Sequence, residues 1–215
     1  MKRFIRNIVI LLLLAFSGLY TYQHAGPYLQ RTFGTTDILP YVSYRVQEFI
    51  NPQKTIQKDE SPNNSGDNHT FNKPVANVYL DLSDPTLRTA SIDALNAWNN
   101  TGAFTFKMIN NKQNAQIIIK AMDDGETNAA GLTNTQYNSL TGHLTKATVN
   151  LNSYYLLNRA YGYNMNRIIN TAEHELGHAI GLNHRQDVSV MYPQGSFYTI
   201  QPSDIQNVKK LYKEN

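Results

Sequence analysis

Eleven residues near the C-terminus carry three imidazoles and one carboxylate at spacings typical of a metal site. They read HELGHAIGLNH, from His174 to His184. On a helix, His174 and His178 are four residues apart, so both rings project from one face about one turn apart. Two neutral nitrogens can then reach one metal ion. Glu175 lies beside the first ligand, where a carboxylate can hold a metal-activated water and accept its proton.

Gly181 is placed to end this helix. A glycine can take positive φ and turn the chain, so that His184 returns as a third ligand. Three protein ligands leave zinc a fourth position for water, which is the arrangement of a catalytic rather than a structural centre. The alternative is an amphipathic helix whose histidines are solvated or hydrogen-bonded, and the added Gly181 and His184 disfavour it.

The segment after the third histidine carries a resemblance to a known family. Met191 follows His184 by seven residues, within the sequence SVMYP. The HExxHxxGxxH motif and this methionine resemble the metzincin clan of zinc endopeptidases, most closely the matrixins. Asp187, the Met-Tyr-Pro tripeptide and the stretch 201–212 are similar to matrixin features. The resemblance covers roughly the last 140 residues.

The resemblance implies both a fold and an activity. The fold is α+β and zincin-like, with a twisted mixed sheet, a long helix, a zinc-binding helix and a C-terminal helix. The activity is a zinc-dependent metalloendopeptidase that hydrolyses peptide bonds through a zinc-activated water, with Glu175 as the general base. His174, His178 and His184 would bind one Zn²⁺, and Met191 would form the apolar floor of the site without being a ligand.

Three features depart from the matrixin pattern. The gap between His184 and Met191 is one residue shorter than usual. Ser203 precedes Asp204 where matrixins carry two adjacent aspartates, so Asp204 alone is left as a partner for the methionine turn. The chain has no cysteine. A propeptide thiolate on zinc, the latency device of many matrixins, is therefore impossible here.

The N-terminus indicates export. Lys2, Arg3 and Arg6 precede the apolar run Ile8–Phe16. A basic start followed by an apolar segment is typical of a signal peptide, and an uncleaved segment over residues 4–22 would be about long enough for one membrane anchor. Residues 1–25 are therefore a signal peptide or an anchor. In either case the catalytic region lies on the extracellular side of the membrane or is secreted.

Two further parts follow the N-terminal segment. Residues 26–72 are predicted to be a flexible linker or a propeptide, with a short strand or amphipathic helix within 41–50 and a polar stretch over 51–72. Residues 73–215 form the catalytic domain. The absence of cysteine excludes disulfides. The net charge of +3, with both signs interspersed, gives no indication of nucleic-acid binding. We expect a monomer whose partner is a protein or peptide substrate.

Periodicity predicts the order of elements in the catalytic domain. An alternating strand is followed by a helix that starts at Ser83-Asp84-Pro85, and the zinc helix follows Asn164. The expected strands cover residues 75–82, 115–121, 129–133 and 144–151, and the expected helix between the first two covers residues 86–100.

The family resemblance also implies where substrate lies. An edge strand would pair with an extended peptide through main-chain hydrogen bonds, and Gly131 and Leu132 belong to the strand in that position. An ordinary loop is the alternative. The segment from Pro193 to Tyr198 would line the pocket for the side chain that follows the cleaved bond.

The acidic residues outside the motif give less evidence of a function. Glu173 is expected to point away from the site into solvent. The acidic run 123–126 could bind Ca²⁺, but an acidic turn is the more common reading of such a run. Two other functions remain open: a non-catalytic extracellular binding domain stabilised by zinc, and a zinc amidase that acts on cell-wall peptides. The presence of Glu175 favours catalysis over the binding domain.

Overall fold

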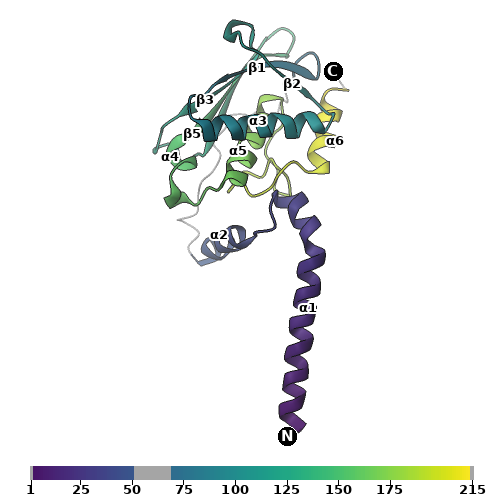
Figure 1. The fold of residues 1–215 in the computed structure, drawn as a ribbon. Coiled ribbons are helices and arrows are strands. Elements are labelled where there is room, and N and C mark those ends of the chain that lie inside the picture. Colours follow the sequence, from purple (N-terminus) through teal and green to yellow (C-terminus); the bar gives the residue numbers. More distant parts are fainter. Residues whose placement is uncertain (1, 51–68, 214–215) are drawn as a thin grey trace.

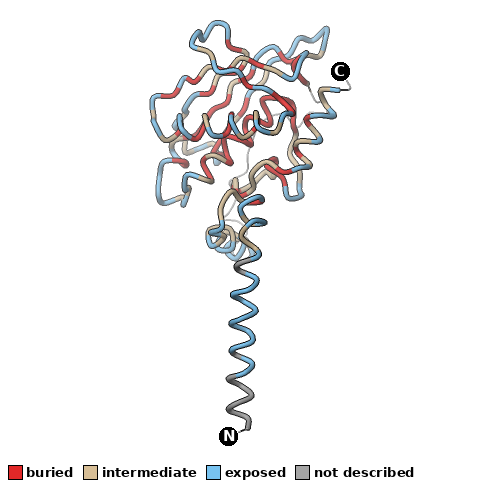
Figure 2. The backbone as a smooth tube through the Cα atoms, turned by 45° about the vertical axis from the view of Figure 1, so that its right-hand side comes forward, coloured by how far each residue is buried: buried red, intermediate tan, exposed pale blue. Residues whose placement is uncertain are grey.

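The computed structural model describes residues 2–50 and 69–213. A long helix, α1 (Lys2–Phe33), extends away from a larger body that contains the sheet (Figure 1). A second helix, α2 (Leu39–Ile50), lies at the base of that body. Figure 2 shows that α1 is exposed over much of its length, whereas the buried residues gather in the body. The core of the protein therefore lies in the C-terminal two thirds of the chain.

Five strands form one sheet, in the order β2-β1-β3-β5-β4. Neighbouring strands are parallel, except that β4 runs antiparallel to β5 at one edge. The strands are β1 (Val75–Asp81), β2 (Thr105–Met108), β3 (Ile117–Met122), β4 (Gly131–Tyr137) and β5 (Leu144–Asn152). This mixed sheet, with its helices, confirms the predicted α+β zincin-like class.

The most apolar strand lies at the centre of the sheet. β3 lies between β1 and β5. Ile117 and Ile119 are fully buried on it, as expected for a strand with neighbours on both sides and helices against one face. The predicted apolar run over 115–121 is confirmed as this strand.

Helices cover one face of the sheet, as Figure 1 shows for α3 and α5. α3 begins where Asp84 accepts a hydrogen bond from the backbone N–H of Leu87 at 2.9 Å and Pro85 occupies the first turn. The helices of the body are α3 (Pro85–Asn100), α4 (Ser153–Leu156), α5 (Met165–Ala179) and α6 (Pro202–Leu211), with 3₁₀ turns η1 (Lys112–Asn114) and η2 (Arg159–Tyr161).

The elements predicted for the catalytic domain occur in the expected order, although strand β2 and the short helix α4 were not among them. Strand β2 was not predicted, because it has only four residues and buries only Phe106 among them. So short a segment carries no detectable alternation. The predicted edge strand is confirmed as β4, although it begins at Gly131 and continues to Tyr137 rather than ending near 133.

The chain before the catalytic domain is more ordered than its composition suggests. Of the two structures proposed for residues 41–50, the helix is confirmed as α2. Phe71 is 1% exposed and belongs to the core, two residues before the predicted start of the domain. The predicted polar stretch 51–72 lies largely outside the described residues.

No helix within the described residues combines the length and the apolar content that are needed to cross a membrane. The choice between a signal peptide and an anchor stays a prediction.

Trp98 joins α3 to the helix that carries the histidines. Its indole is fully buried, and Nε1 donates a hydrogen bond to the carbonyl oxygen of Glu173 at 2.9 Å. We predict that Trp98→Phe lowers the free energy of unfolding by about 1–3 kcal/mol, because it leaves a cavity and removes the donor. Urea denaturation measures this. Tyr137→Phe, at an exposed ring, is the control and should change stability little; equal stability of both variants would contradict the assigned role of Trp98.

Candidate active site

Helix α5 presents the first two histidines to one point. Asn164 caps it by accepting a hydrogen bond from the N–H of Arg167 at 3.0 Å. The helix then carries His174 and His178 on its buried side, where they are 5% and 1% exposed. Their Nε2 atoms lie 3.1 Å apart. The spacing of four residues thus brings the two rings together, as predicted.

Backbone carbonyls set the tautomer of both rings. Nδ1 of His174 lies 2.6 Å from the carbonyl oxygen of Val190, and Nδ1 of His178 lies 2.8 Å from that of Leu182. A carbonyl can only accept, so each Nδ1 carries the proton in the neutral ring and each Nε2 presents a lone pair. Two lone pairs that face each other at this distance repel unless a cation lies between them.

The third histidine arrives by the predicted turn. α5 ends at Ala179, and Gly181 has φ of +101°. A Cβ at Gly181 would collide with the carbonyl oxygen of His69, so both the backbone angle and the space require glycine. The chain then returns, and Nε2 of His184 lies 3.2 Å from Nε2 of His178.

The donor set fits zinc. The three ligand atoms lie within 4.8 Å of one another, and this is the one such group found among the described His, Cys, Asp and Glu side chains. Two imidazole nitrogens bound to a tetrahedral zinc at about 2.0–2.1 Å are separated by about 3.3 Å, close to the separations seen between these rings. Two Nδ1 atoms already hydrogen-bonded to carbonyls hold their rings in the orientation that a metal needs.

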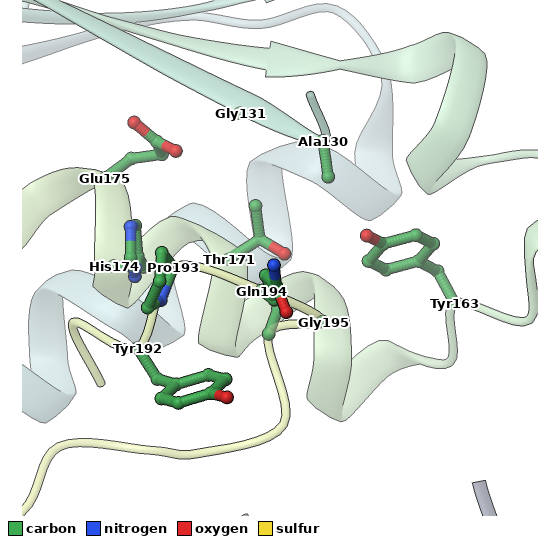
Figure 3. A pocket seen from close by; sticks show the side chains of 11 residues that line it. Ala130, Gly131, Tyr163, Thr171, His174, Glu175, Tyr192, Pro193, Gln194 and Gly195 are labelled. Atoms are coloured by element: carbon green, nitrogen blue, oxygen red, sulfur yellow. The ribbon is translucent and has the colours of Figure 1, made fainter. Parts of the chain in front are cut away.

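Glu175 lies between α5 and the edge strand. It is 1% exposed, and Oε2 accepts a hydrogen bond from the hydroxyl of Thr133 at 2.6 Å. A Cβ on Gly131 would occupy the space of the Glu175 carboxylate, so glycine is required where β4 begins. Figure 3 shows the Glu175 side chain extending toward the strand at Gly131. The strand thereby positions the carboxylate beside the histidines.

A buried carboxylate ties the methionine turn to the last helix. Asp204 is fully buried and accepts hydrogen bonds from the hydroxyl of Ser189 at 2.5 Å and from the N–H groups of Val190 and Gln201, both at 2.9 Å. Met191, also fully buried, lies against Gly177 so closely that a Cβ there would collide with its sulfur. This places Met191 against α5 at Gly177, between the positions of His174 and His178 in the helix.

A cavity opens beside His174 and Glu175 (Figure 3). Two of the predicted substrate-binding residues, Gly131 and Pro193, line it, whereas Leu132 and Tyr198 do not. The other lining residues are Ala130, Tyr163, Thr171, Tyr192, Gln194, Gly195 and Ser196. The cavity thus lies between the edge strand and the segment after the methionine turn.

Comparison with known proteins identifies the family. The family model described as Matrixin matches residues 67–213, well over half of the chain. The chain belongs to the matrixin family. Two solved structures of myroilysin align with it at 14% sequence identity; one alignment covers 68% of this chain and 96% of that chain with a TM-score of 0.45, the other 69% and 86% with 0.48. No curated protein matches the chain.

Family membership indicates the general class of activity. Matrixins are zinc metalloproteases, and this matrixin carries a three-histidine group that is able to hold one ion. The resemblance in the motif and methionine turn is therefore confirmed at the level of the family.

The prediction for Glu173 was wrong. This matrixin buries Glu173 to 2% exposure, and Oε2 accepts hydrogen bonds from the hydroxyl of Thr199 at 2.7 Å and the N–H of Ile200 at 3.2 Å. The pKa of Glu173 is raised to about 7, mainly by burial and to a smaller extent by the charge of Asp204, although these two hydrogen bonds act to lower it. A helical wheel places Glu173 away from the metal, but it cannot show that the chain after the methionine turn covers that face.

Three further residues of the matrixin site have no motif that would reveal them. Thr133 holds Glu175. Arg167 is 9% exposed and donates hydrogen bonds to the carbonyl oxygen of Gly195 at 2.8 and 3.0 Å. Asn152 is fully buried and its Nδ2 donates to the carbonyl oxygens of Asp124 and Ala129, which fixes the loop that leads into β4.

The acidic run proposed as a calcium site forms a hydrogen-bonded turn. Oδ1 of Asp124 accepts a hydrogen bond from the N–H of Glu126 at 2.8 Å, and the N–H of Asp124 donates to Asn152 at 3.0 Å. Such a turn needs no ion. Calcium binding here stays a prediction.

Asp204 offers a test of how the methionine turn supports the metal. We predict that Asp204→Asn lowers the free energy of unfolding by about 2 kcal/mol and weakens zinc binding at least about 10-fold, because one of the two acceptor oxygens becomes a donor group. Thermal unfolding and competition with a zinc chelator measure the two effects. Ser203→Ala is the neighbouring control. Unchanged zinc affinity in Asp204→Asn would contradict the link between α6 and the metal site.

Proposed function

We propose that this matrixin is a zinc-dependent endopeptidase that cleaves peptide bonds in proteins at the cell surface or outside the cell. The observation that carries this proposal is the convergence of three imidazole Nε2 atoms beside the buried carboxylate of Glu175, at the rim of a cavity. The basic and apolar N-terminal segment supports an extracytoplasmic location.

The roles of the site residues follow from their positions. His174, His178 and His184 would hold the zinc ion. When bound, zinc supplies Lewis acidity that lowers the pKa of water to about 7 and polarises a carbonyl group. Glu175 then accepts a proton from the attacking water and delivers it to the leaving amine nitrogen. Burial of Glu175 keeps solvent from competing for this proton.

Substrate would lie along the edge strand. β4 is the last strand of the sheet order, so one side of it has no strand neighbour within the described sheet. An extended peptide can pair with such an edge through main-chain hydrogen bonds that do not depend on side-chain sequence. Gly131 begins this strand at the cavity, with Pro193 on the opposite side. Leu132, next along the strand, would contact the peptide.

Glu175 provides the test of the proposed function. We predict that the full chain loaded with zinc cleaves members of a quenched peptide library, and that Glu175→Ala and Glu175→Gln lower kcat/KM by at least about 10²-fold, because the general base is lost. Both variants should bind one zinc per chain, as Glu175 is not a ligand. A chelator should stop cleavage by the parent chain, and added zinc should restore it.

Two outcomes would redirect the proposal. If zinc binds but the parent cuts no peptide, the non-catalytic binding domain gains support; cleavage of cell-wall peptides alone would support the amidase. If Glu175→Gln cleaves as fast as the parent, the assigned base is wrong.

Thr133 should affect catalysis without binding metal. We predict that Thr133→Val lowers kcat about 10-fold, since the hydroxyl that holds the Glu175 carboxylate is removed and a hydrogen bond to a charged group contributes about 1.5–3 kcal/mol. Steady-state kinetics and zinc content measure this. Thr145→Val, the same change at an exposed position of β5, is the matched control. Loss of zinc from Thr133→Val would show that the residue acts on the fold instead.

A further inference from the structure

The chain from Tyr192 to Gln201, here called the wall loop, forms one side of the cavity. Gly195 and Ser196 in this loop have φ of +79° and +48°, so the loop has an uncommon backbone path that its surroundings must hold. Its residues that line the cavity are Tyr192, Pro193, Gln194, Gly195 and Ser196. The shape of the cavity therefore depends on what fixes this loop.

Helix α5 holds the wall loop from one side. Besides the two hydrogen bonds that Arg167 gives to Gly195, Nδ2 of Asn170 donates to the carbonyl oxygens of Ser196 at 3.2 Å and Phe197 at 3.1 Å. The Arg167 guanidinium also lies 4.4 Å from the centre of the Phe197 ring. These contacts come from the catalytic domain itself.

The end of α1 holds the same loop by its backbone. The N–H of Thr199 donates a hydrogen bond to the carbonyl oxygen of Thr32 at 3.1 Å, and Nε2 of Gln201 donates to the same oxygen at 3.3 Å. Thr32 is 4% exposed. Figure 1 shows the chain before α6 passing over the end of α1. Residues far apart in sequence thus share a buried contact behind the cavity wall.

Helix α2 contributes two tyrosine hydroxyls. Oη of Tyr41 lies 3.1 Å from Oη of Tyr198, and Oη of Tyr44 donates to Oε1 of Gln194 at 3.4 Å. Gln194 lines the cavity. Burial, and next the charge of Glu48, raise the pKa of Tyr44 to about 12, so its hydroxyl stays protonated at neutral pH. The Tyr44 hydroxyl is therefore available as a donor to the amide oxygen of Gln194.

The aromatic ring of Phe197 lies between side chains of α2 and a side chain of α5. The rings of Tyr41 and Tyr44 lie 5.4 and 5.0 Å from it, centre to centre, and Arg167 contacts it from α5. Among the residues that the structure describes, the opposite face of α2 is open to solvent, with Val42 and Val46 44% and 50% exposed. Only one face of this helix is directed at the cavity wall.

We propose that Tyr44, together with Tyr41, is a specificity-determining positioning residue: the segment from Thr32 to Tyr44 holds the wall loop in place and so decides which substrate side chain the cavity accepts. The inference rests on the proposed endopeptidase function and extends it, because it makes the segment before the catalytic domain part of the substrate site. Neither tyrosine lines the cavity. They act through Gln194 and the backbone of the loop.

The test compares the two faces of α2 in the full zinc-loaded chain. Cleavage of a peptide library by Tyr44→Phe, Tyr44→Ala and Tyr41→Ala is measured beside Val42→Ala and Val46→Ala. We expect KM for the best peptide to rise about 10-fold in Tyr44→Ala and about 3-fold in Tyr44→Phe, with kcat and zinc content near those of the parent. The preference for the residue after the cut bond should broaden. The two valine variants should match the parent.

Hydrogen exchange provides a readout that does not need activity. The amides of the wall loop, Thr199 in particular, should exchange at least about 10-fold faster in Tyr44→Ala and Tyr41→Ala than in Val42→Ala, because their surroundings loosen.

An unchanged cleavage profile in Tyr44→Ala overturns the specificity role, even if the loop exchanges faster. Equal exchange in Tyr44→Ala and Val42→Ala overturns the assigned contact. If the zinc-loaded parent cuts no peptide, the endopeptidase function fails and the specificity role fails with it, while the exchange rates still decide whether α2 holds the loop.

Discussion

The Nε2 lone pairs of His174 and His178 face each other and repel, and hydrogen bonds elsewhere in the structure hold the two rings against that repulsion. The Nε2 atoms of His178 and its two neighbours lie 3.1 and 3.2 Å apart, and hydrogen bonds from Nδ1 of two rings to backbone carbonyls prevent them from turning away. Such an arrangement has a low free energy only with a cation at its centre. A bound metal ion and the surrounding fold would therefore stabilise each other.

The carbonyls that orient the rings are themselves held by distant parts of the chain. Val190 belongs to the methionine turn, which Asp204 connects to α6. Leu182 follows the glycine turn that ends α5, and the close fit of that turn against His69 links it to the start of the described domain. The cavity wall in turn contacts α1 and α2. The site is thus supported from both ends of the sequence, and the catalytic region is not independent of the segment that precedes it.

Much of the metal site could be predicted from sequence because it is local. A helical period places His174 and His178 on one face, and Gly181 is required by its backbone angle, so the pattern alone predicts the geometry. Contacts between distant segments could not be predicted in this way. The burial of Glu173 could not be predicted, because the residues that cover it, Thr199 and Ile200, are distant in the sequence. Thr133 likewise carries no motif that connects it to Glu175. The tyrosines of α2 indicated a short strand or an amphipathic helix, but not what their face contacts.

The central claim is that three histidines hold zinc and leave one coordination position open beside Glu175. X-ray absorption spectroscopy of the full chain loaded with one zinc ion tests this most directly. The account predicts three imidazole nitrogens at about 2.0–2.1 Å and one further light atom that an added hydroxamate replaces. A zinc ion with four protein ligands, or a chain that binds no zinc at all, would contradict it.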